Sequence, residues 1–363
     1  MENPRLVDKN NFLSVTEVIQ SHVDTVEFGP SSVQVAGWIF HPTIPIQRIS
    51  VLIGNRVLAT DVPFTDRPDV QECFKDAPFR SDNTLRSGFK FQAPADFQPA
   101  DPYNVLVTIL PFTAEGPLRA VYILYCNVPY DEASRPQPPS HLKMRIGGEV
   151  NYTQTGLATL SLILTHVATF RSLAGFGRVL DWGCGAGRVA RHLAKCIDPA
   201  DVHGCDIDPE AIRWAQENLA PSRFTAIPTH PPTAYECAFF DVVYGISVMT
   251  HLDEPTQLQW LAELRRITRP GAILLLSVIS GPMREASMPA HLRSEFDSKG
   301  FAAYVPDYEQ SFREFSEEGY YKEAYHSIDY IQRVWGKFFT IEEHAKCLIS
   351  TGQDLILLRR TAD

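Results

Sequence analysis

Apolar and polar positions follow two different rhythms along this chain. Residues 32–128 contain short runs rich in Val, Ile, Tyr and Phe, separated by turn-forming stretches, which is typical of antiparallel strands. From residue 178 onwards, strand-like apolar runs alternate with runs whose apolar positions recur at helical spacing. Such alternation predicts an α/β fold, a parallel sheet with helices on both faces. We therefore expect a β-sandwich of about six strands within residues 1–128 and an α/β domain over residues 151–363.

The segments around these domains carry other patterns. Residues 15–22 predict a short helix, and residues 153–173 predict a longer one with an apolar stripe. Residues 129–150 begin with four prolines among polar residues, which favours an extended linker. Residues 281–325 are rich in charged and aromatic residues, so we interpret them as a lid-like insertion over the carboxyl edge of the sheet.

Composition and charge limit the classes of function. With 363 residues, 44% of them hydrophobic and 21% charged, the chain can bury two cores and is globular in composition. The formal net charge of −10 argues against an extended nucleic-acid surface, which needs clustered Lys and Arg. There is no membrane-length apolar run and no leader pattern, so we expect a cytoplasmic protein. The seven cysteines form no C-x-x-C pair or His-containing cluster, so we expect neither a disulfide framework nor a metal site.

The stretch VLDWGCGAGRVA, residues 179–190, carries the main chemical signal. It ends a strand near Asp181, turns through Gly183, Gly185 and Gly187, and begins a helix. Alternating glycines expose bare backbone amides to a ligand. A dinucleotide fingerprint instead has the spacing G-x-G-x-x-G and holds a pyrophosphate. Here a carboxylate precedes the glycines, and it would repel a pyrophosphate but suit a positively charged amino-acid group.

A second carboxylate follows at the tip of the next predicted strand. Asp206 lies 25 residues after Asp181 and ends the run VHGCD. At this place an acid can accept both ribose hydroxyl groups of an adenosyl ligand, as it also does in NAD enzymes. Asp206 therefore indicates an adenosyl cofactor without selecting one.

The motif D-x-G-C-G-x-G-R, with F-D-x-V at residues 240–243, resembles a bacterial group of the class I, Rossmann-like S-adenosylmethionine-dependent methyltransferases. The resemblance covers roughly residues 138–361. It implies a doubly wound seven-stranded sheet of order 3-2-1-4-5-7-6 with the last strand antiparallel, and S-adenosylmethionine as cofactor. The cofactor contacts that it implies are Tyr152, Asp181, Gly183, Gly185, Gly187, Arg188, Asp206, Ile207, Ile246 and Ser247. The acid that binds adenine in many relatives is missing, so we expect adenine to meet backbone near Thr229 or apolar walls.

Three short motifs in the predicted sandwich also resemble a known module. Residues 37–40 (GWIF), 67–70 (RPDV) and 87–89 (SGF) look like a β-sandwich appended to bacterial surface-polysaccharide glycosyltransferases and methyltransferases. Trp38 and Phe89 within these motifs are either core residues or a platform for sugars, and we prefer core packing.

Two histidines are candidates for a general base. Methyl transfer needs the acceptor, methyl carbon and sulfur held in line in a site largely closed to water, and a hydroxyl acceptor also benefits from a base. His251 follows the fourth predicted strand, at the rim where an acceptor would meet the cofactor, and His326 follows the insertion. The alternative, which we prefer for each, is packing: His251 within its loop or at the start of the next helix, and His326 within the lid. An amine acceptor would need neither base.

The sequence thus predicts a methyltransferase that modifies a hydroxyl or amine of a glycan or small metabolite. A peptide or natural-product amine is the alternative acceptor. A non-catalytic scaffold that keeps the fold, and an NAD-dependent oxidoreductase, are the competing functions. We expect no nucleic-acid partner and no membrane span, and a homo-oligomer is compatible with the sequence.

Overall fold

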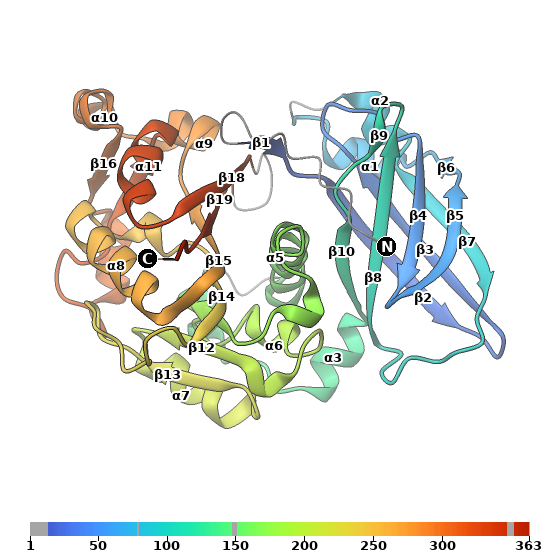
Figure 1. The fold of residues 1–363 in the computed structure, drawn as a ribbon, viewed down its shortest axis with the longest axis horizontal. Helices are drawn as coiled ribbons and strands as arrows, with labels where there is room; N and C mark the ends of the chain where they lie inside the picture. Colours follow the sequence, from blue (N-terminus) through green and yellow to red (C-terminus); the bar gives the residue numbers. More distant parts are fainter. Residues whose placement is uncertain (1–13, 78–79, 147–150, 347–351, 363) are drawn as a thin grey trace.

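The computed structural model describes residues 14–77, 80–146, 151–346 and 352–362. Its N-terminal part is built from two antiparallel sheets beside a larger α/β part (Figure 1). One sheet has the order β2 (Gln20–Phe28), β3 (Ser32–Phe40), β7 (Gly88–Pro94) and β6 (Phe64–Thr65). The other has the order β10 (Val121–Cys126), β8 (Asn104–Thr113), β4 (Arg48–Ile53) and β5 (Arg56–Val62), and β9 (Gly116–Pro117) pairs with β8. Helices α1 (Pro68–Cys73) and α2 (Ser81–Leu85) connect β6 to β7.

Alternation along the strands makes this part a sandwich. Every second residue of β3 is buried, and these residues share one core with apolar residues of β4 and β8. Phe89 is 2% exposed within this core. Trp38 is half-buried and packs against Phe40 and Phe74 with ring centroids 5.8 and 5.7 Å apart. Both aromatic residues therefore take part in packing.

The α/β part is organised around an eight-stranded sheet. Its order is β1 (Ser14–Glu17), β18 (Thr340–Lys346), β19 (Asp354–Arg359), β15 (Thr268–Val278), β14 (Phe240–Gly245), β11 (Val179–Trp182), β12 (Val202–Asp206) and β13 (Arg223–Ala226). Only β19 runs antiparallel to its neighbours in this sheet, as the pairs among the described residues show.

The eighth strand overturns the helix expected for residues 15–22. Residues 14–17 pair in parallel with β18, and the chain continues into β2 from Gln20. Between the two strands Val18 is 4% exposed and its N–H donates to the Lys346 carbonyl at 3.3 Å. Unpaired backbone groups at a sheet edge accept another strand readily, and these long-range bonds outweigh the local helical pattern.

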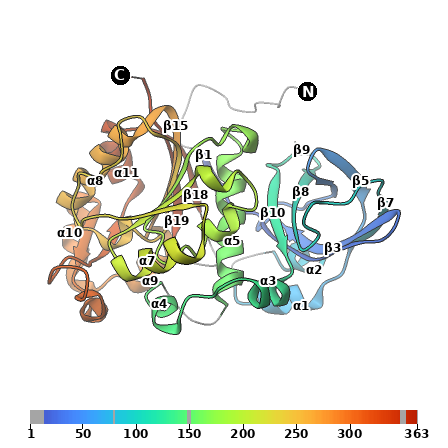
Figure 2. The same cartoon turned by 90° about the horizontal axis from the view of Figure 1, so that it is seen from below.

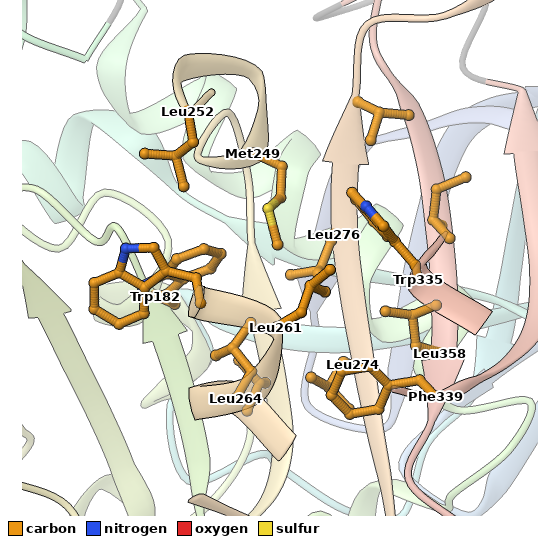
Figure 3. Close-up of a cluster of buried hydrophobic side chains, with 14 of the residues drawn as sticks. Trp182, Met249, Leu252, Leu261, Leu264, Leu274, Leu276, Trp335, Phe339 and Leu358 are labelled. Atoms are coloured by element: carbon orange, nitrogen blue, oxygen red, sulfur yellow. The ribbon is translucent and has the colours of Figure 1, made fainter. Parts of the chain in front are cut away.

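Helices cover both faces of the large sheet. Apolar residues of α5 (Tyr152–Val167), α6 (Ala190–Leu193) and α7 (Pro209–Asn218) share a core with Val179, Val242 and Ile273. Those of α8 (Glu254–Ile267) and α11 (Ile328–Val334) share a second core with Leu180, Leu274 and Leu276, part of which Figure 3 shows. Successive residues along each strand point to opposite faces of the sheet and so pack into different cores, as a parallel sheet buried on both faces requires.

The segment expected to be an extended linker is partly helical and packed. It contains α3 (Val128–Ser134) and α4 (Ser140–Met144). Leu142 of α4 is 2% exposed and contacts Ala186 and Ala211 of the α/β part. Burial of this leucine fixes the segment against the sheet's helices, which the prolines alone did not predict.

Residues 281–325 form a small subdomain. It consists of α9 (Gly281–Ser287), α10 (Arg293–Lys299) and a two-stranded antiparallel sheet of β16 (Phe301–Tyr304) and β17 (Glu323–His326). Short 3₁₀ turns, among them Ala290–Leu292 and Asp307–Phe312, join these elements.

Helix α5 joins the sandwich to the large sheet, and both views place it between them (Figures 1 and 2). On its sandwich side, Ser161 Oγ donates to the Tyr122 carbonyl at 2.7 Å, and Thr165 Oγ1 accepts from the Tyr122 N–H at 3.1 Å. Tyr122 belongs to the edge strand β10. The helix therefore satisfies backbone groups that would otherwise leave a sheet edge open.

A buried ion pair reinforces the same interface. Arg119 Nη1 donates to Glu343 Oε1 of β18 at 2.9 Å and lies 2.5 Å from His166 Nδ1 of α5. The Glu343 side chain is fully buried. Burial alone would raise the pKa of Glu343, but the hydrogen bond with His166 and the charge of Arg119 outweigh it and lower the pKa to about 2.

We expect Glu343→Gln to lower the free energy of unfolding by about 2 kcal/mol, because it removes a buried charged acceptor. The charged carboxylate stabilises the fold fully above its ordinary pKa of 4.5, and this contribution is lost as the pH falls towards 2. Urea unfolding between about pH 7 and 3 should therefore show a shallower acid dependence in the variant. Glu342→Gln is the matched control, because Glu342 is a neighbour on the same strand and pairs with the partly exposed Arg359. Equal losses in both variants would contradict the role of Glu343.

Candidate functional site

A cavity of about 780 Å³ opens at the carboxyl ends of β11, β12 and β14. Ligands of open α/β sheets bind at this edge. Lining residues come from the strand ends, from α4 and its following turn, and from the insertion: His141, Met144, Arg145, Ile146, Asp181, Trp182, Gly183, Cys184, Arg188, Val189, Asp206, Ile207, Ile227, Ile246, Ser247, Val248, His251, Leu252, Trp260, Tyr308, Ser311, Phe312, Glu314, Tyr320 and Tyr321. The insertion therefore supplies part of the cavity lining at the carboxyl edge of the sheet.

The glycine turn needs its glycines for two physical reasons. Gly183 and Gly185 have φ angles of +78° and +52°, in the left-handed region that side chains disfavour. A Cβ atom on Gly183 would also lie 2.3 Å from Val248 Cγ2, and one on Gly185 would lie 2.8 Å from Ile146 Cγ2. The turn is thus pressed between the loop after β14 and the segment after α4.

Asp181 lines the cavity and has a buried carboxylate. Its residue is 5% exposed, and its Oδ2 has no hydrogen-bond partner among the described residues. Burial raises the pKa of Asp181 to about 7, although the nearby Tyr244 hydroxyl and Arg188 guanidinium act in the opposite direction. A buried acceptor without a donor is costly, so this oxygen fits a cationic ligand group.

Two backbone N–H groups fix the orientation of the Asp206 carboxylate. Its Oδ2 accepts from the Gly185 N–H at 2.7 Å and its Oδ1 accepts from the Asp208 N–H at 2.9 Å. Burial raises the pKa of Asp206 to about 6, against the effect of these two bonds. Each oxygen has a second lone pair, so the carboxylate can still accept from two ligand hydroxyls.

Ser247 lies opposite the glycine turn in a strained conformation. Its φ angle is +60°, which is rare for a residue with a side chain and often marks a functional site. Its N–H donates to Ser277 Oγ at 2.7 Å, and Gln353 Nε2 donates to its Oγ at 2.8 Å. Ser277 and Gln353, which the sequence did not single out, therefore hold Ser247 in place.

Three of the expected cofactor residues are not among those that line the cavity. The Gly185 N–H donates to Asp206 and its carbonyl accepts from Cys184 Sγ, and a Cβ on Gly187 would meet Leu219 at 2.5 Å, behind the turn. Tyr152 is 3% exposed, and its hydroxyl lies 3.3 Å from the Ala186 carbonyl that accepts from it. Tyr152 therefore packs under the glycine turn. Arg188, Ile207 and Ile246 do line the cavity.

His251 lies on the cavity wall with its tautomer fixed. Its Nδ1 lies 3.0 Å from the carbonyl oxygen of Lys322, and because a carbonyl can only accept, Nδ1 carries the proton. Its Nε2 then has a free lone pair, with no hydrogen-bond partner among the described residues. Burial lowers the pKa of His251, so the ring is neutral at neutral pH.

His326, the other candidate base, is placed elsewhere. It is fully buried, its Nε2 lies 3.0 Å from Gln257 Oε1, and its ring packs against Phe301 and Trp335. It is not among the lining residues of the cavity. The structure therefore places His326 in the core between α8 and α11, where apolar neighbours rather than a ligand surround it.

The Thr229 carbonyl already accepts two hydrogen bonds. Its carbonyl accepts from Trp260 Nε1 at 3.2 Å and from the Tyr320 hydroxyl at 2.7 Å. Ile207 and Ile227 line the cavity near the end of β12. Of the two expected partners for adenine, apolar walls fit the structure better.

Arg145 connects three parts of the site, although the sequence did not single it out. Its Nη1 donates to Asp208 Oδ2 at 2.8 Å and to Glu210 Oε2 at 2.9 Å, and its Nη2 donates to Glu314 Oε2 at 2.8 Å. The first two acids begin α7, whereas Glu314 belongs to the insertion. Arg145 therefore ties the insertion to the sheet domain across the mouth of the cavity.

The described residues contain no group of His, Cys, Asp and Glu suited to a metal ion. Within the same residues, no helix is long and apolar enough to cross a membrane.

Comparison with known proteins gives matches in the α/β part. The family model described as a methyltransferase domain matches residues 179–271. The ubiquinone biosynthesis O-methyltransferase of Xanthomonas oryzae pv. oryzae (strain PXO99A) is 28% identical over 121 residues, which cover 32% of this chain and 48% of that protein. The phthiotriol/phenolphthiotriol dimycocerosates methyltransferase of Mycobacterium leprae (strain TN) is 29% identical over 153 residues, which cover 42% of this chain and 52% of that protein.

Solved structures give a further similarity. Magnesium protoporphyrin IX methyltransferase from Synechocystis PCC 6803, with bound SAH, is similar with a TM-score of 0.40 and 18% identity, covering 61% of this chain and 93% of that one. The chain spans between 22% and 52% of the length of the first curated relatives that it matches. The segment that the methyltransferase-domain model matches, residues 179–271, holds the glycine turn, both acidic strand ends and His251.

Proposed function

We propose that this chain is an S-adenosylmethionine-dependent methyltransferase that modifies a hydroxyl group of a small acceptor. The observation that carries the proposal is the pair of buried carboxylates, Asp181 and Asp206, beside the glycine turn in one cavity. Asp206 would accept from the ribose hydroxyls, and Asp181 would face the ammonium group of the amino-acid end. Arg188 would bind the carboxylate of the cofactor's amino-acid end, and Ile207 and Ile227 would flank its adenine.

The residues of the chain have to accept one proton, exclude water and align the acceptor with the methyl group. When bound, the sulfonium supplies a methyl group whose bond to sulfur breaks, with the electron pair left on sulfur, as the bond to the acceptor oxygen forms. His251 Nε2 takes the hydroxyl proton and later releases it to water. The insertion and Arg145 exclude water and hold the acceptor in line.

The larger organisation belongs to the same proposal. We assign residues 151–363 to the methyltransferase domain, and the sandwich within residues 1–128 to an accessory domain that supports α5. A glycan remains a candidate acceptor because the sandwich motifs resemble a module found beside surface-polysaccharide enzymes. A peptide or natural-product amine remains the alternative acceptor.

Calorimetry with S-adenosylhomocysteine and with NADH tests the cofactor assignment. We expect S-adenosylhomocysteine to bind with one site per chain and NADH to give no heat of binding, because Asp181 repels a pyrophosphate. Binding of NADH alone would support the oxidoreductase instead, and binding of neither would overturn the proposal.

The affinity for S-adenosylhomocysteine is expected to fall below about pH 7. The pKa values of Asp181 and Asp206 are about 7 and 6, so both carboxyls gain protons as the pH decreases through this range. A protonated Asp181 no longer attracts an ammonium group, and each carboxyl that must ionise costs up to about tenfold in affinity per pH unit below its pKa. Calorimetry between about pH 8 and 5.5 would measure this slope. Asp181→Asn should bind more weakly and lose the step near pH 7, whereas a pH-independent affinity in the unmodified chain would contradict the assignment.

A further inference from the structure

We propose that the acceptor is an uncharged aromatic compound with a hydroxyl group, held flat against aromatic side chains of the insertion. The inference rests on the proposed function and narrows its acceptor class. It concerns the outer part of the cavity, which we call the acceptor chamber and define by Met144, His251, Tyr308, Phe312, Tyr320 and Tyr321.

Aromatic rings lead without a break from His251 to the surface. The rings of His251 and Tyr321 are 5.3 Å apart, and Tyr321 stacks on Phe312 at 4.1 Å with an interplanar angle of 10°. Phe312 in turn meets Tyr308 at 6.3 Å. Tyr308 is 43% exposed and Met144 is 64% exposed, so apolar side chains of the chamber reach the surface beside the ion pairs of Arg145. Tyr321 and Phe312 each turn one face to the other, so their remaining faces and their edges are the aromatic surface available to a flat ring.

The chamber offers little to a negatively charged acceptor. Arg145 is shared by the carboxylates of Asp208, Glu210 and Glu314, and His141 lies 2.9 Å from Glu210. Burial lowers the pKa of His251, which leaves its ring neutral. The acids around Arg145 outnumber the cations, so a phosphate or carboxylate would meet net repulsion. Nucleotide-linked or phosphorylated sugars are therefore disfavoured.

The supply of hydrogen-bonding groups separates an aromatic ring from a sugar. The Tyr320 hydroxyl donates to the Thr229 carbonyl, and the Tyr308 hydroxyl lies 3.5 Å from Glu323 Oε2. Among the described chamber residues, only His251 Nε2 and the Tyr321 hydroxyl have no partner for their polar side-chain atoms. A buried hydroxyl without a partner costs about 1–3 kcal/mol. One or two phenolic hydroxyls match the two free groups of the chamber, whereas a pyranose would need Ser311 or Glu314, which line the same cavity, for its further hydroxyls.

The chemistry of the base agrees with this choice. A phenolic hydroxyl has an ordinary pKa of about 10, far below that of water at about 15.7, so a neutral imidazole removes its proton more readily than that of an alkyl alcohol. The proton passes to His251 Nε2 as the oxygen gains the methyl group, and the products are a methyl ether and a neutral thioether.

Binding to the full chain, saturated with S-adenosylhomocysteine, tests the inference. We would titrate catechol, its anionic analogue dihydroxybenzoate, and methyl glucoside, and follow each by calorimetry. Catechol should bind at least tenfold more tightly than the other two, and with S-adenosylmethionine it should yield its monomethyl ether. Tighter binding of methyl glucoside or dihydroxybenzoate, or no binding of catechol, would overturn the inference while leaving the cofactor assignment intact. Failure of S-adenosylhomocysteine itself to bind would overturn the proposed function and this inference together.

Replacement of the Phe312 ring tests the contribution of the aromatic rings of the acceptor chamber. Phe312→Leu should weaken catechol binding by about two- to tenfold, because it removes the interaction energy of one aromatic pair. The affinity for S-adenosylhomocysteine should change little. Phe296→Leu is the matched control, because Phe296 lies in the same insertion, in a separate apolar cluster with Ile279 and Leu292, and is not among the lining residues. Thermal unfolding of both variants would confirm that they are folded. Equal catechol affinities in the two variants would contradict stacking on the wall.

Discussion

Replacement of His251 by glutamine is expected to lower turnover of a hydroxyl acceptor by about a hundredfold to ten-thousandfold, the usual contribution of a positioned base. Glutamine keeps a polar side chain on the wall, but it cannot take the acceptor's proton. Binding of S-adenosylhomocysteine should be almost unchanged, because His251 faces the acceptor chamber. Turnover with catechol, measured as S-adenosylhomocysteine formed per second, is the appropriate readout.

The pH profile makes this prediction specific to a base. In the unmodified chain, turnover should rise with pH through the lowered pKa of His251, because only the neutral ring accepts a proton. The variant should lose this limb of the profile. His326→Gln is the comparison, since His326 is buried against Gln257 outside the cavity and should retain turnover if the variant remains folded. If His326→Gln lost most of its turnover and His251→Gln lost none, the assignment of the base to His251 would be contradicted.

Gly183→Ala is expected to abolish measurable cofactor binding. An alanine there must adopt a φ of +78°, and its Cβ would lie 2.3 Å from Val248 Cγ2, so the turn and the loop after β14 must separate. That movement displaces the wall that includes Ser247 and Val248 from the cofactor site. We expect calorimetry to show a loss of at least about a hundredfold in affinity for S-adenosylhomocysteine.

Gly271→Ala separates backbone strain from the effect on the site. Gly271 has a similar φ of +81°, but a Cβ there would meet no atom within 4 Å. Its alanine variant should lose roughly 1 kcal/mol of stability from the strained backbone and should bind S-adenosylhomocysteine normally. Equal binding losses in the two variants would mean that general destabilisation, and not the geometry at Gly183, lowers the affinity.

Local pattern and strand order allowed much of the site to be predicted. Asp206 ends β12 and Asp181 lies one residue before the end of the neighbouring parallel strand β11, so their side chains lie at one edge of the sheet. His251 follows the next strand along the same edge, which explains why the cavity includes it. In each case the functional position depends on a strand end, and strand ends in an alternating α/β pattern can be recognised in the sequence.

Contacts between distant segments could not be predicted in the same way. Residues 14–17 pair with β18, more than 300 positions away, and no local signal identifies that partner. Gln353 and Ser277 are ordinary polar residues until the fold places them around Ser247. Arg145 lies in a proline-rich stretch that suggested a spacer, and only its three carboxylate partners reveal its role. His326 illustrates the reverse case, because a histidine beside tyrosines in a lid resembles a base until its burial is known.

The measurement that tests the central claim most directly is calorimetry of S-adenosylhomocysteine with the unmodified chain and with Asp206→Asn. The account predicts one site in the unmodified chain and at least about tenfold weaker binding in the variant, because an amide cannot accept charge-assisted hydrogen bonds from both ribose hydroxyls. Asp198→Asn, which alters an acid on another loop that accepts from the Ala200 N–H, should bind as the unmodified chain does. An unmodified chain that does not bind the nucleoside, or an Asp206→Asn variant that binds it equally well, would contradict the assignment of this cavity.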